Sequence, residues 1–316
     1  MVHFYDISQW EEHQYYGTGG TRNKIIVENP EDGCLYYFKT SLKKEGRDYK
    51  YEFWSEIIAS EIGQFLGLNI LHYDVAWKDN GLGCLSKSMI DPLKEELQEG
   101  YKWLTGFDTK YDINDDEAYT FQSIERMLNA IFKQENFINK IIEIIVFDSI
   151  IGNEDRHQEN WSIIVTNQLV NKNSIFRKGK TISETSYSFA PIYDSGSSMG
   201  RELTDKKVEQ MITDRVQLDA YINRGKSEIH WEGEIGKQKH LELIRKISDY
   251  GYKDEVLSII GFIHSHYDAN VISKIVSNID ECLPEKLSTQ KITQTRKDFL
   301  IKLLSLRFDK LFALQL

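Results

Sequence analysis

The chain has 316 residues, of which 41% are hydrophobic and 28% charged, a composition typical of a soluble globular protein of one to three domains. Its 49 acidic residues outnumber the 39 basic ones and give a formal net charge of −10. This balance argues against a protein whose main partner is nucleic acid, although a local basic cleft is compatible with it.

The N-terminal sequence has no basic region followed by an apolar run, so no secretory signal is visible and we expect a cytoplasmic protein. Secretion by a route without a cleaved signal is also compatible with the sequence. The most apolar stretch, residues 141–151, is too short to span a bilayer, and no membrane association is expected. The three widely spaced cysteines, Cys34, Cys84 and Cys282, predict reduced thiols.

The first predicted unit is a hairpin, with strands at residues 25–27 and 35–39, preceded by glycines at residues 17–20. Such a loop lets backbone N–H groups approach phosphate oxygens, although most glycine clusters before strands are ordinary turns. Lys39 ends the second strand. A lysine there is commonly a solvated edge charge, but its place after the loop is the one that a phosphate-pairing lysine requires.

A helix is predicted over residues 51–66, ended by Gly67. A lysine that contacts phosphate is held by a glutamate on such a helix, and two candidates are present. The helical wheel places Glu61 within the apolar arc, where a carboxylate needs a partner, and Glu56 nearly opposite. The wheel therefore favours Glu61.

Two further strands, residues 72–78 and 83–90, are joined by a turn at 78–81. The connection to a second lobe would follow, and Lys87 and Met89 are the expected adenine contacts there. This predicts a small lobe over residues 1–88 and a larger lobe over residues 89–316.

The larger lobe begins with helices predicted at residues 118–132 and 135–150, the second ending at Gly152-Asn153. A short strand at 161–165, an irregular polar segment at 167–187 and a partner strand at 188–193 follow. The remainder, from residue 205, is predicted to be helical structural support, and its scattered basic residues are expected to be solvated.

The functional prediction depends on three residues in order: Asp155, then Asn160 five positions later, then Asp194 after the second strand. Singly, either aspartate could be a turn residue, and His157 a structural histidine. In the order glycine loop, strand lysine, helix glutamate, D-x-x-x-x-N and aspartate, they predict a kinase. The expected fold is α+β and bilobal, protein-kinase-like, with a small β-rich N-lobe and a larger, mostly helical C-lobe.

The same residues resemble a known family. The pattern N-x-D-x-H-x-x-N at Asn153, Asp155, His157 and Asn160 is similar to the catalytic loop of the HipA-like serine/threonine kinases. Residues 191–195 (PIYDS) resemble their metal-binding motif, and residues 55–69 resemble their first long helix. The likeness covers roughly residues 17 to 200, and the chain looks like the shorter relatives that lack an extra N-terminal subdomain.

The resemblance implies an ATP- and Mg²⁺-dependent kinase that transfers the γ-phosphate to a protein Ser or Thr. Catalytic residues would be Asp155, His157, Asn160, Asp194 and Lys39. Metal ligands would be Asn160 and Asp194. ATP-binding residues would be Gly17, Thr18, Gly19, Gly20, Lys24, Lys39, Glu56, Lys87 and Met89, with Glu56 rather than Glu61 holding the lysine.

The resemblance also implies a toxin-like kinase with an antitoxin partner and a translation factor as substrate, whereas some shorter relatives look like secreted effectors. In the family a loop serine is autophosphorylated. Residues 19–24 depart from that loop pattern, and Thr18 and Thr21 are the hydroxyls available there.

Asp-Arg-His-x-x-Asn also occurs in phosphoinositide kinases, so a lipid or small-molecule kinase is the main alternative. Against it stand the missing Asp-Phe-Gly motif, the acidic balance and the lack of a membrane-seeking segment. A pseudokinase that binds a partner through its helical tail is a third hypothesis, which the presence of every required polar residue disfavours.

Overall fold

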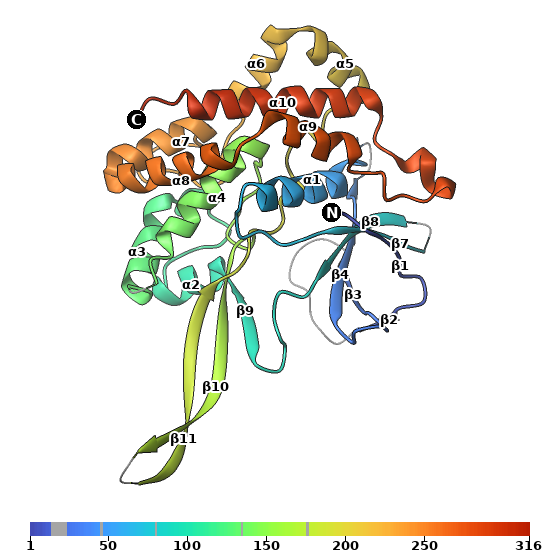
Figure 1. Ribbon diagram of the computed structural model, residues 1–316. Helices are drawn as coiled ribbons and strands as arrows, with labels where there is room; N and C mark the ends of the chain where they lie inside the picture. Colours follow the sequence, from blue (N-terminus) through green and yellow to red (C-terminus); the bar gives the residue numbers. More distant parts are fainter. Residues whose placement is uncertain (14–23, 45–46, 80, 134, 175–176) are drawn as a thin grey trace.

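The computed structural model describes residues 1–13, 24–44, 47–79, 81–133, 135–174 and 177–316. Its small lobe is built on a curled β-sheet and its large lobe is mostly helical, as Figure 1 shows. The predicted α+β, bilobal kinase-like fold is therefore confirmed. The glycines of residues 17–20 and both loop threonines, Thr18 and Thr21, lie outside the described residues.

The small-lobe sheet has six strands in the order β1-β7-β8-β4-β3-β2. Strands β3 and β4 form the predicted hairpin, and β7 and β8 form the second pair. All neighbours are antiparallel except β1, which runs parallel to β7. The six strands are β1 (Phe4–Asp6), β2 (Glu11–Glu12), β3 (Lys24–Glu28), β4 (Leu35–Thr40), β7 (Asp74–Lys78) and β8 (Gly81–Lys87). A two-stranded pair, β5 (Lys43–Lys44) with β6 (Arg47–Asp48), leads into the first helix.

Helix α1 (Glu52–Phe65) lies between the small-lobe sheet and the C-terminal helices (Figure 1). Eleven of its 14 residues are buried, including Glu56. The helix is therefore covered on nearly all sides rather than along one stripe, and a helical wheel cannot tell an inward from an outward glutamate here. The chain leaves α1 through Gly67, whose φ of +77° suits the end of a helix.

The large lobe is assembled around α4 (Ile138–Ile151), of whose 14 residues 11 are buried. Helices from the C-terminal part of the chain pack against α4. Most of its residues are apolar, as expected of a central helix, and the three that are not fully buried are Asn139, Lys140 and Glu143. The other helices are α2 (Gly100–Phe107), α3 (Phe121–Ile131), α5 (Asp205–Thr213), α6 (Arg215–Arg224), α7 (His240–Ile247), α8 (Lys253–His266), α9 (Ala269–Asn278) and α10 (Gln294–Phe312).

Residues 162–189 differ from the prediction. The segment 167–187, expected to be irregular, continues two strands as a long hairpin of β10 (Ser162–Ser174) and β11 (Arg177–Phe189). It projects from the body of the molecule in Figure 1. A third strand that the sequence did not suggest, β9 (Glu95–Glu99), pairs with the base of β10. The hairpin base lies between the loop that carries Asp155 and the segment that carries Asp194.

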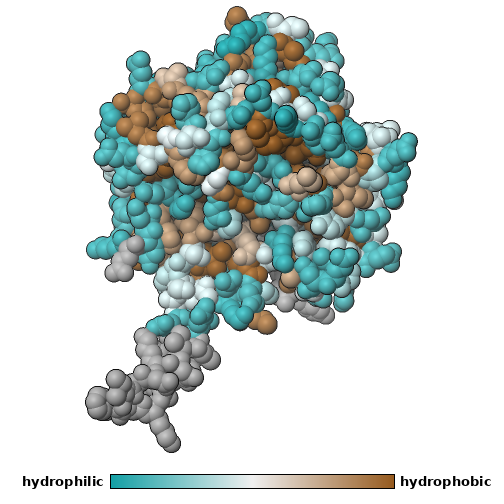
Figure 2. Space-filling view, in the orientation of Figure 1, coloured by the Kyte–Doolittle hydropathy of each residue, from teal (hydrophilic) through white to brown (hydrophobic). Residues whose placement is uncertain are grey.

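One large apolar core joins α1 to the helices of the large lobe, and a smaller one lies inside the small-lobe sheet around Val27 and Phe38. On the face shown in Figure 2, polar side chains cover most of the surface and apolar ones form separate patches. None of the helices among the described residues has the length and apolar character needed to cross a membrane. The three cysteines are free thiols, as predicted.

Candidate active site

The loop between α4 and β10 carries the first two predicted functional residues. Gly152 ends α4 with a φ of +69°, and a Cβ there would lie 2.4 Å from Nη2 of Arg307, so this close turn requires glycine. Asn153 then accepts a hydrogen bond from the backbone N–H of Asp155 (3.3 Å). The side-chain amide of Asn160 donates to the carbonyl oxygen of Asp155 (2.6 Å). Both the backbone N–H and the backbone carbonyl of Asp155 are thus fixed by hydrogen bonds.

Arg156 joins this loop to the segment that carries Asp194, and sequence reasoning missed it. Its guanidinium is 1% exposed and binds both carboxylate oxygens of Asp148 at 2.9 Å. It also donates to the carbonyl oxygens of Asn160 (2.8 Å) and Tyr193 and to the hydroxyl of Ser195 (3.2 Å). The sequence feature that could have revealed it is its place in Asp-Arg-His, between two predicted site residues, Asp155 and His157.

The charge of the buried Arg156 guanidinium is balanced by the carboxylate of Asp148. Burial alone would lower the pKa of the Arg156 guanidinium, but the nearby carboxylates, of which Asp148 contributes most, together raise that pKa above its usual value. The arginine therefore stays charged, and its fork of donors fixes two loops at once.

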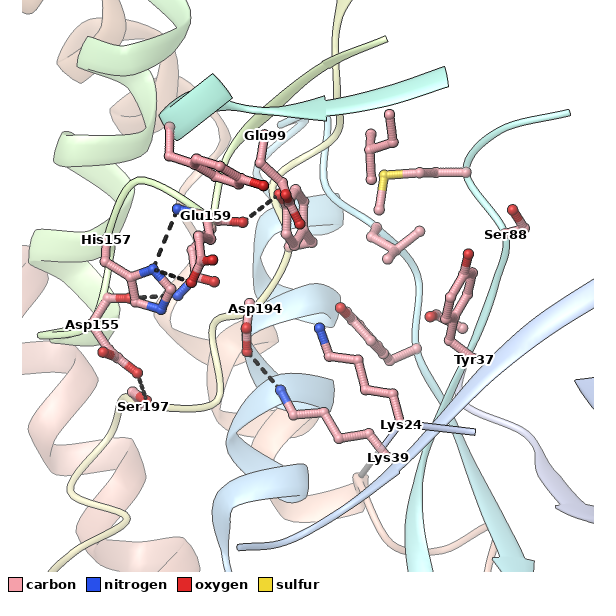
Figure 3. A pocket seen from close by; sticks show the side chains of 18 of the residues that line it. Lys24, Tyr37, Lys39, Ser88, Glu99, Asp155, His157, Glu159, Asp194 and Ser197 are labelled. Carbon is pink, nitrogen blue, oxygen red and sulfur yellow. Dashed lines mark hydrogen bonds and ion pairs between the residues drawn. The ribbon is translucent and has the colours of Figure 1, made fainter. Parts of the chain in front are cut away.

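Asp194 lies in the loop that follows β11, with a φ of +54°. Aspartate tolerates this left-handed conformation better than most residues, and such backbone strain is concentrated at functional sites. Its Oδ1 lies 2.6 Å from Nζ of Lys39, which comes from β4 in the other lobe (Figure 3). The pair joins two residues 155 positions apart in the chain.

Glu56 stands behind this pair. Its Oε2 lies 3.4 Å from Nζ of Lys39, and its Oε1 accepts a hydrogen bond from the backbone N–H of Ser195 at 2.7 Å. The side chain is 1% exposed. Glu61 instead lies near the N-terminal amine (3.5 Å) and His72 (3.7 Å). The wheel argument for Glu61 was wrong, because α1 is buried on nearly all sides.

Lys39 and Asp194 line a cleft of about 1220 Å³ between the lobes. Its polar part contains Lys24, Lys39, Asp155, Asn160 and Asp194, so residues that are far apart in the sequence meet in one place. Figure 3 shows Asp194 beside the two lysines and Asp155 farther from them, next to Ser197. Their catalytic and metal-binding roles stay predictions.

Lys24 and Lys39 lie directly opposite each other on β3 and β4. Two like charges in a cross-strand pair repel each other, and an anion between them removes that cost. Both side chains enter the cleft beside Asp194 (Figure 3). The pair is a candidate site for phosphate oxygens.

The opposite end of the cleft is apolar. Its lining includes Leu71, Met89, Ile90 and Leu97, which pack around Tyr193. Burial raises the pKa of the Tyr193 hydroxyl, which therefore stays neutral. A flat, uncharged ring such as adenine fits this chemistry.

Three other residues predicted to belong to the site, Met89, Lys87 and His157, also line the cleft. Met89 lies in the apolar wall of the cleft. Lys87 also lines the cleft, but its ammonium lies 3.3 Å from Asp32 in the turn before β4. His157 lines the cleft next to Asp155, and its Nδ1 accepts a hydrogen bond from the backbone N–H of Glu159 (3.3 Å).

The donor set suits Mg²⁺ in the presence of phosphate. Within the described ranges, no group of three or more His, Cys, Asp or Glu side chains could hold a metal ion by itself. Mg²⁺ is commonly bound by one or two protein ligands plus substrate phosphates and water. Because the amide nitrogen of Asn160 is bonded to Asp155, its carbonyl oxygen is the atom offered as a ligand beside Asp194. The residues present therefore fit a phosphate-bound magnesium ion.

Comparisons with known proteins find similarity in sequence and in fold. No protein-family model matches the chain. The serine/threonine-protein kinase CtkA of Helicobacter pylori (strain J99) is 21% identical over 301 residues, which cover 93% of this chain and 81% of that protein. The crystal structure of the H. pylori proinflammatory kinase CtkA matches with a TM-score of 0.74 at 20% identity, covering 99% of this chain and 96% of that one.

A structure of the Shewanella oneidensis MR-1 toxin–antitoxin complex of HipA, HipB and operator DNA matches with a TM-score of 0.46 at 10% identity, covering 97% of this chain and 67% of that chain. The match to CtkA extends over both lobes, so the chain is similar to CtkA in sequence and shares its bilobal fold.

Proposed function

We propose that the protein is a kinase that transfers the γ-phosphate of Mg²⁺-bound ATP to a serine or threonine hydroxyl of a protein. The observation that carries this proposal is that Lys39, Asp155 and Asp194, drawn from both lobes, line one cleft, with Glu56 buried beside Lys39. The similarity to CtkA, which is named a serine/threonine-protein kinase, supports the same reaction class.

Each residue of the site is assigned a role from its position in or beside the cleft. Lys24 and Lys39 would neutralise phosphate oxygens, with Glu56 keeping Lys39 in place. Asp194 and Asn160 would hold magnesium, which supplies charge neutralisation across the phosphates. Asp155 would orient the acceptor hydroxyl and take its proton. In phosphoryl transfer most of the rate comes from positioning and charge stabilisation, so these side chains account for the main requirements.

Asp155→Asn and Asp194→Asn test the proposal. Each should reduce kcat by a factor on the order of a hundred or more, because a general base or a metal ligand is lost while shape is kept. Asp298→Asn removes an exposed carboxylate on α10 and is the matched control. Each protein would be incubated with labelled ATP, Mg²⁺ and cell extract. Full turnover by either cleft variant would contradict the role given to that aspartate.

The same assay separates the substrate classes. Label on protein supports the proposal, whereas label confined to the organic extract or to small molecules supports the alternative of a lipid or small-molecule kinase. A phosphoproteome compared between wild type and Asp155→Asn would identify the target. The antitoxin partner and the translation-factor substrate implied by the family resemblance stay predictions.

A further inference from the structure

Asp155 has a hydroxyl group of the protein itself at its carboxylate. Ser197 Oγ donates a hydrogen bond to Oδ2 of Asp155 at 2.9 Å (Figure 3). This distance lies within the range expected between a general base and the hydroxyl that it deprotonates. Two roles fit the contact: Ser197 is a fixed partner that orients the base, or it is an internal phosphate acceptor.

The backbone around Ser197 favours the fixed partner. The carbonyl oxygen of Ser197 accepts a hydrogen bond from the backbone N–H of Glu154 (3.4 Å), the residue before Asp155. Two residues further on, Met199 N–H donates to the carbonyl oxygen of Ile151 (2.9 Å). The segment is thus bonded to the loop at Glu154 and to the end of α4 at Ile151, and the backbone of Ser197 cannot move toward a phosphate without breaking these bonds.

The preceding residues are anchored as firmly. Ser195 N–H is bonded to the buried carboxylate of Glu56 (2.7 Å), and Ser198 Oγ donates to the carbonyl oxygen of Ser195 (2.6 Å). Ser198 is 1% exposed. Ser197 therefore sits in a rigid turn whose ends are fixed to the small-lobe helix and to α4. A hydroxyl presented from such a turn has a defined position.

The hydrogen bond from Ser197 can fix the orientation of the Asp155 carboxylate, which the bonds to the Asp155 backbone cannot do. Asn153 and Asn160 fix its main chain, but a fixed backbone leaves several side-chain rotamers open. The hydrogen bond from Ser197 acts on the carboxylate itself. We propose that Ser197 is a positioning residue that holds the Asp155 carboxylate in its proton-accepting orientation. This inference rests on the kinase function proposed above.

Kinetics of Ser197→Ala and Ser197→Thr provide the first test. Ser197→Ala should lower kcat roughly tenfold, a part of the 10²–10⁴ that a general base supplies, and should change the KM for ATP less than about twofold. Ser197→Thr keeps the hydroxyl and should recover most of the loss. Ser265→Ala, at an exposed serine on α8, is the control for loss of a hydroxyl elsewhere.

A double-mutant cycle shows whether Ser197 acts through Asp155. In the Asp155→Ala background, adding Ser197→Ala should leave the residual rate unchanged, because the group being positioned is gone. Equal loss from Ser197→Ala with and without Asp155 would overturn the inference. So would an unchanged kcat in the single variant, or a phosphate found on Ser197 of wild-type protein after incubation with ATP.

A crystal structure of Ser197→Ala tests the inference without any activity. The Asp155 carboxylate should leave the orientation seen here in Ser197→Ala and keep it in Ser197→Thr. An unchanged carboxylate in the alanine variant would refute the positioning role. A wild-type protein without phosphotransfer would instead refute the proposed function, and the crystallographic result would still decide whether Ser197 orients Asp155.

Discussion

Glu56→Gln is the sharpest probe of the small-lobe side of the site. Glutamine keeps an oxygen that can accept the hydrogen bond from the N–H of Ser195, now 2.7 Å long, but it loses the charge that faces Lys39. Lys39 is then left with Asp194, at 2.6 Å, as its carboxylate partner in this ion-pair group. The expected result is a correctly folded protein whose lysine is poorly placed.

The cost to stability follows from the burial of the pair. Both side chains are at most 10% exposed, so losing one charged hydrogen bond should cost about 2 kcal/mol. With an unfolding entropy of about 2.1 cal/mol/K per residue over 316 residues, this lowers Tm by about 3 °C. The loss of kcat should be far larger, on the order of a hundredfold, because a displacement of about 1 Å at a reacting group has that effect.

Glu61→Gln is the matched control on the same helix. Its carboxylate lies outside the cleft lining and near the chain terminus and His72, so turnover should stay within about twofold of wild type. Both variants would be compared by thermal melting and by labelled-ATP turnover. Wild-type turnover in Glu56→Gln, or an equal loss in Glu61→Gln, would refute the assignment of Glu56.

Three further predictions concern the scaffold of the site. Arg156→Met removes the ionic partner of the buried carboxylate of Asp148 and should cost about 3–5 kcal/mol in urea unfolding, whereas Arg126→Met, at an exposed ion pair, should cost less than about 1 kcal/mol; equal costs would contradict this. Gly100→Ala places a Cβ 2.2 Å from the ring of Trp161 and should lower unfolding free energy by roughly 1–3 kcal/mol, while Gly106→Ala, with open space in the same helix, should not. His240 supplies a pH dependence: burial, then the charge of Arg307, lowers its pKa to about 3, so the folded protein keeps it neutral while the unfolded chain protonates it below about 6.5. Stability should therefore fall as pH drops from 6.5 toward 3, by about 2 kcal/mol at pH 5, and His240→Gln should remove that part of the difference between urea unfolding at pH 7 and pH 5.

Much of the site was predictable because its residues keep a fixed order along the chain. Lys39, Asp155, Asn160 and Asp194 were identified from their spacing and from the strands expected around them, and the structure places all four in one cleft. Arg156 was not identified as the link, because spacing cannot reveal that one side chain reaches Asp148, Asn160, Tyr193 and Ser195 together.

The long hairpin of β10 and β11 was missed for a different reason. Strand prediction depends on alternating apolar and polar residues, which arise when one face of a sheet is buried. Residues 167–187 are polar along most of their length, and the hairpin projects from the body, so no buried face imposes that alternation. Backbone pairing, as between Asn167 and Thr185, holds the strands together instead.

The position of α1 limits how the activity of the proposed kinase can be regulated. Its first turn is bonded to Arg201 through Glu52, Ser55 Oγ donates to the carbonyl oxygen of Ser198, and α9 packs along the helix. In kinases the position of the helix that carries the lysine-binding glutamate can control activity, because activation moves this helix inward. In this protein an outward movement of α1 would expose apolar surface of the main core. The stable state is therefore the one in which Glu56 lies next to Lys39. Control is therefore expected to act on access of nucleotide or substrate rather than on this helix.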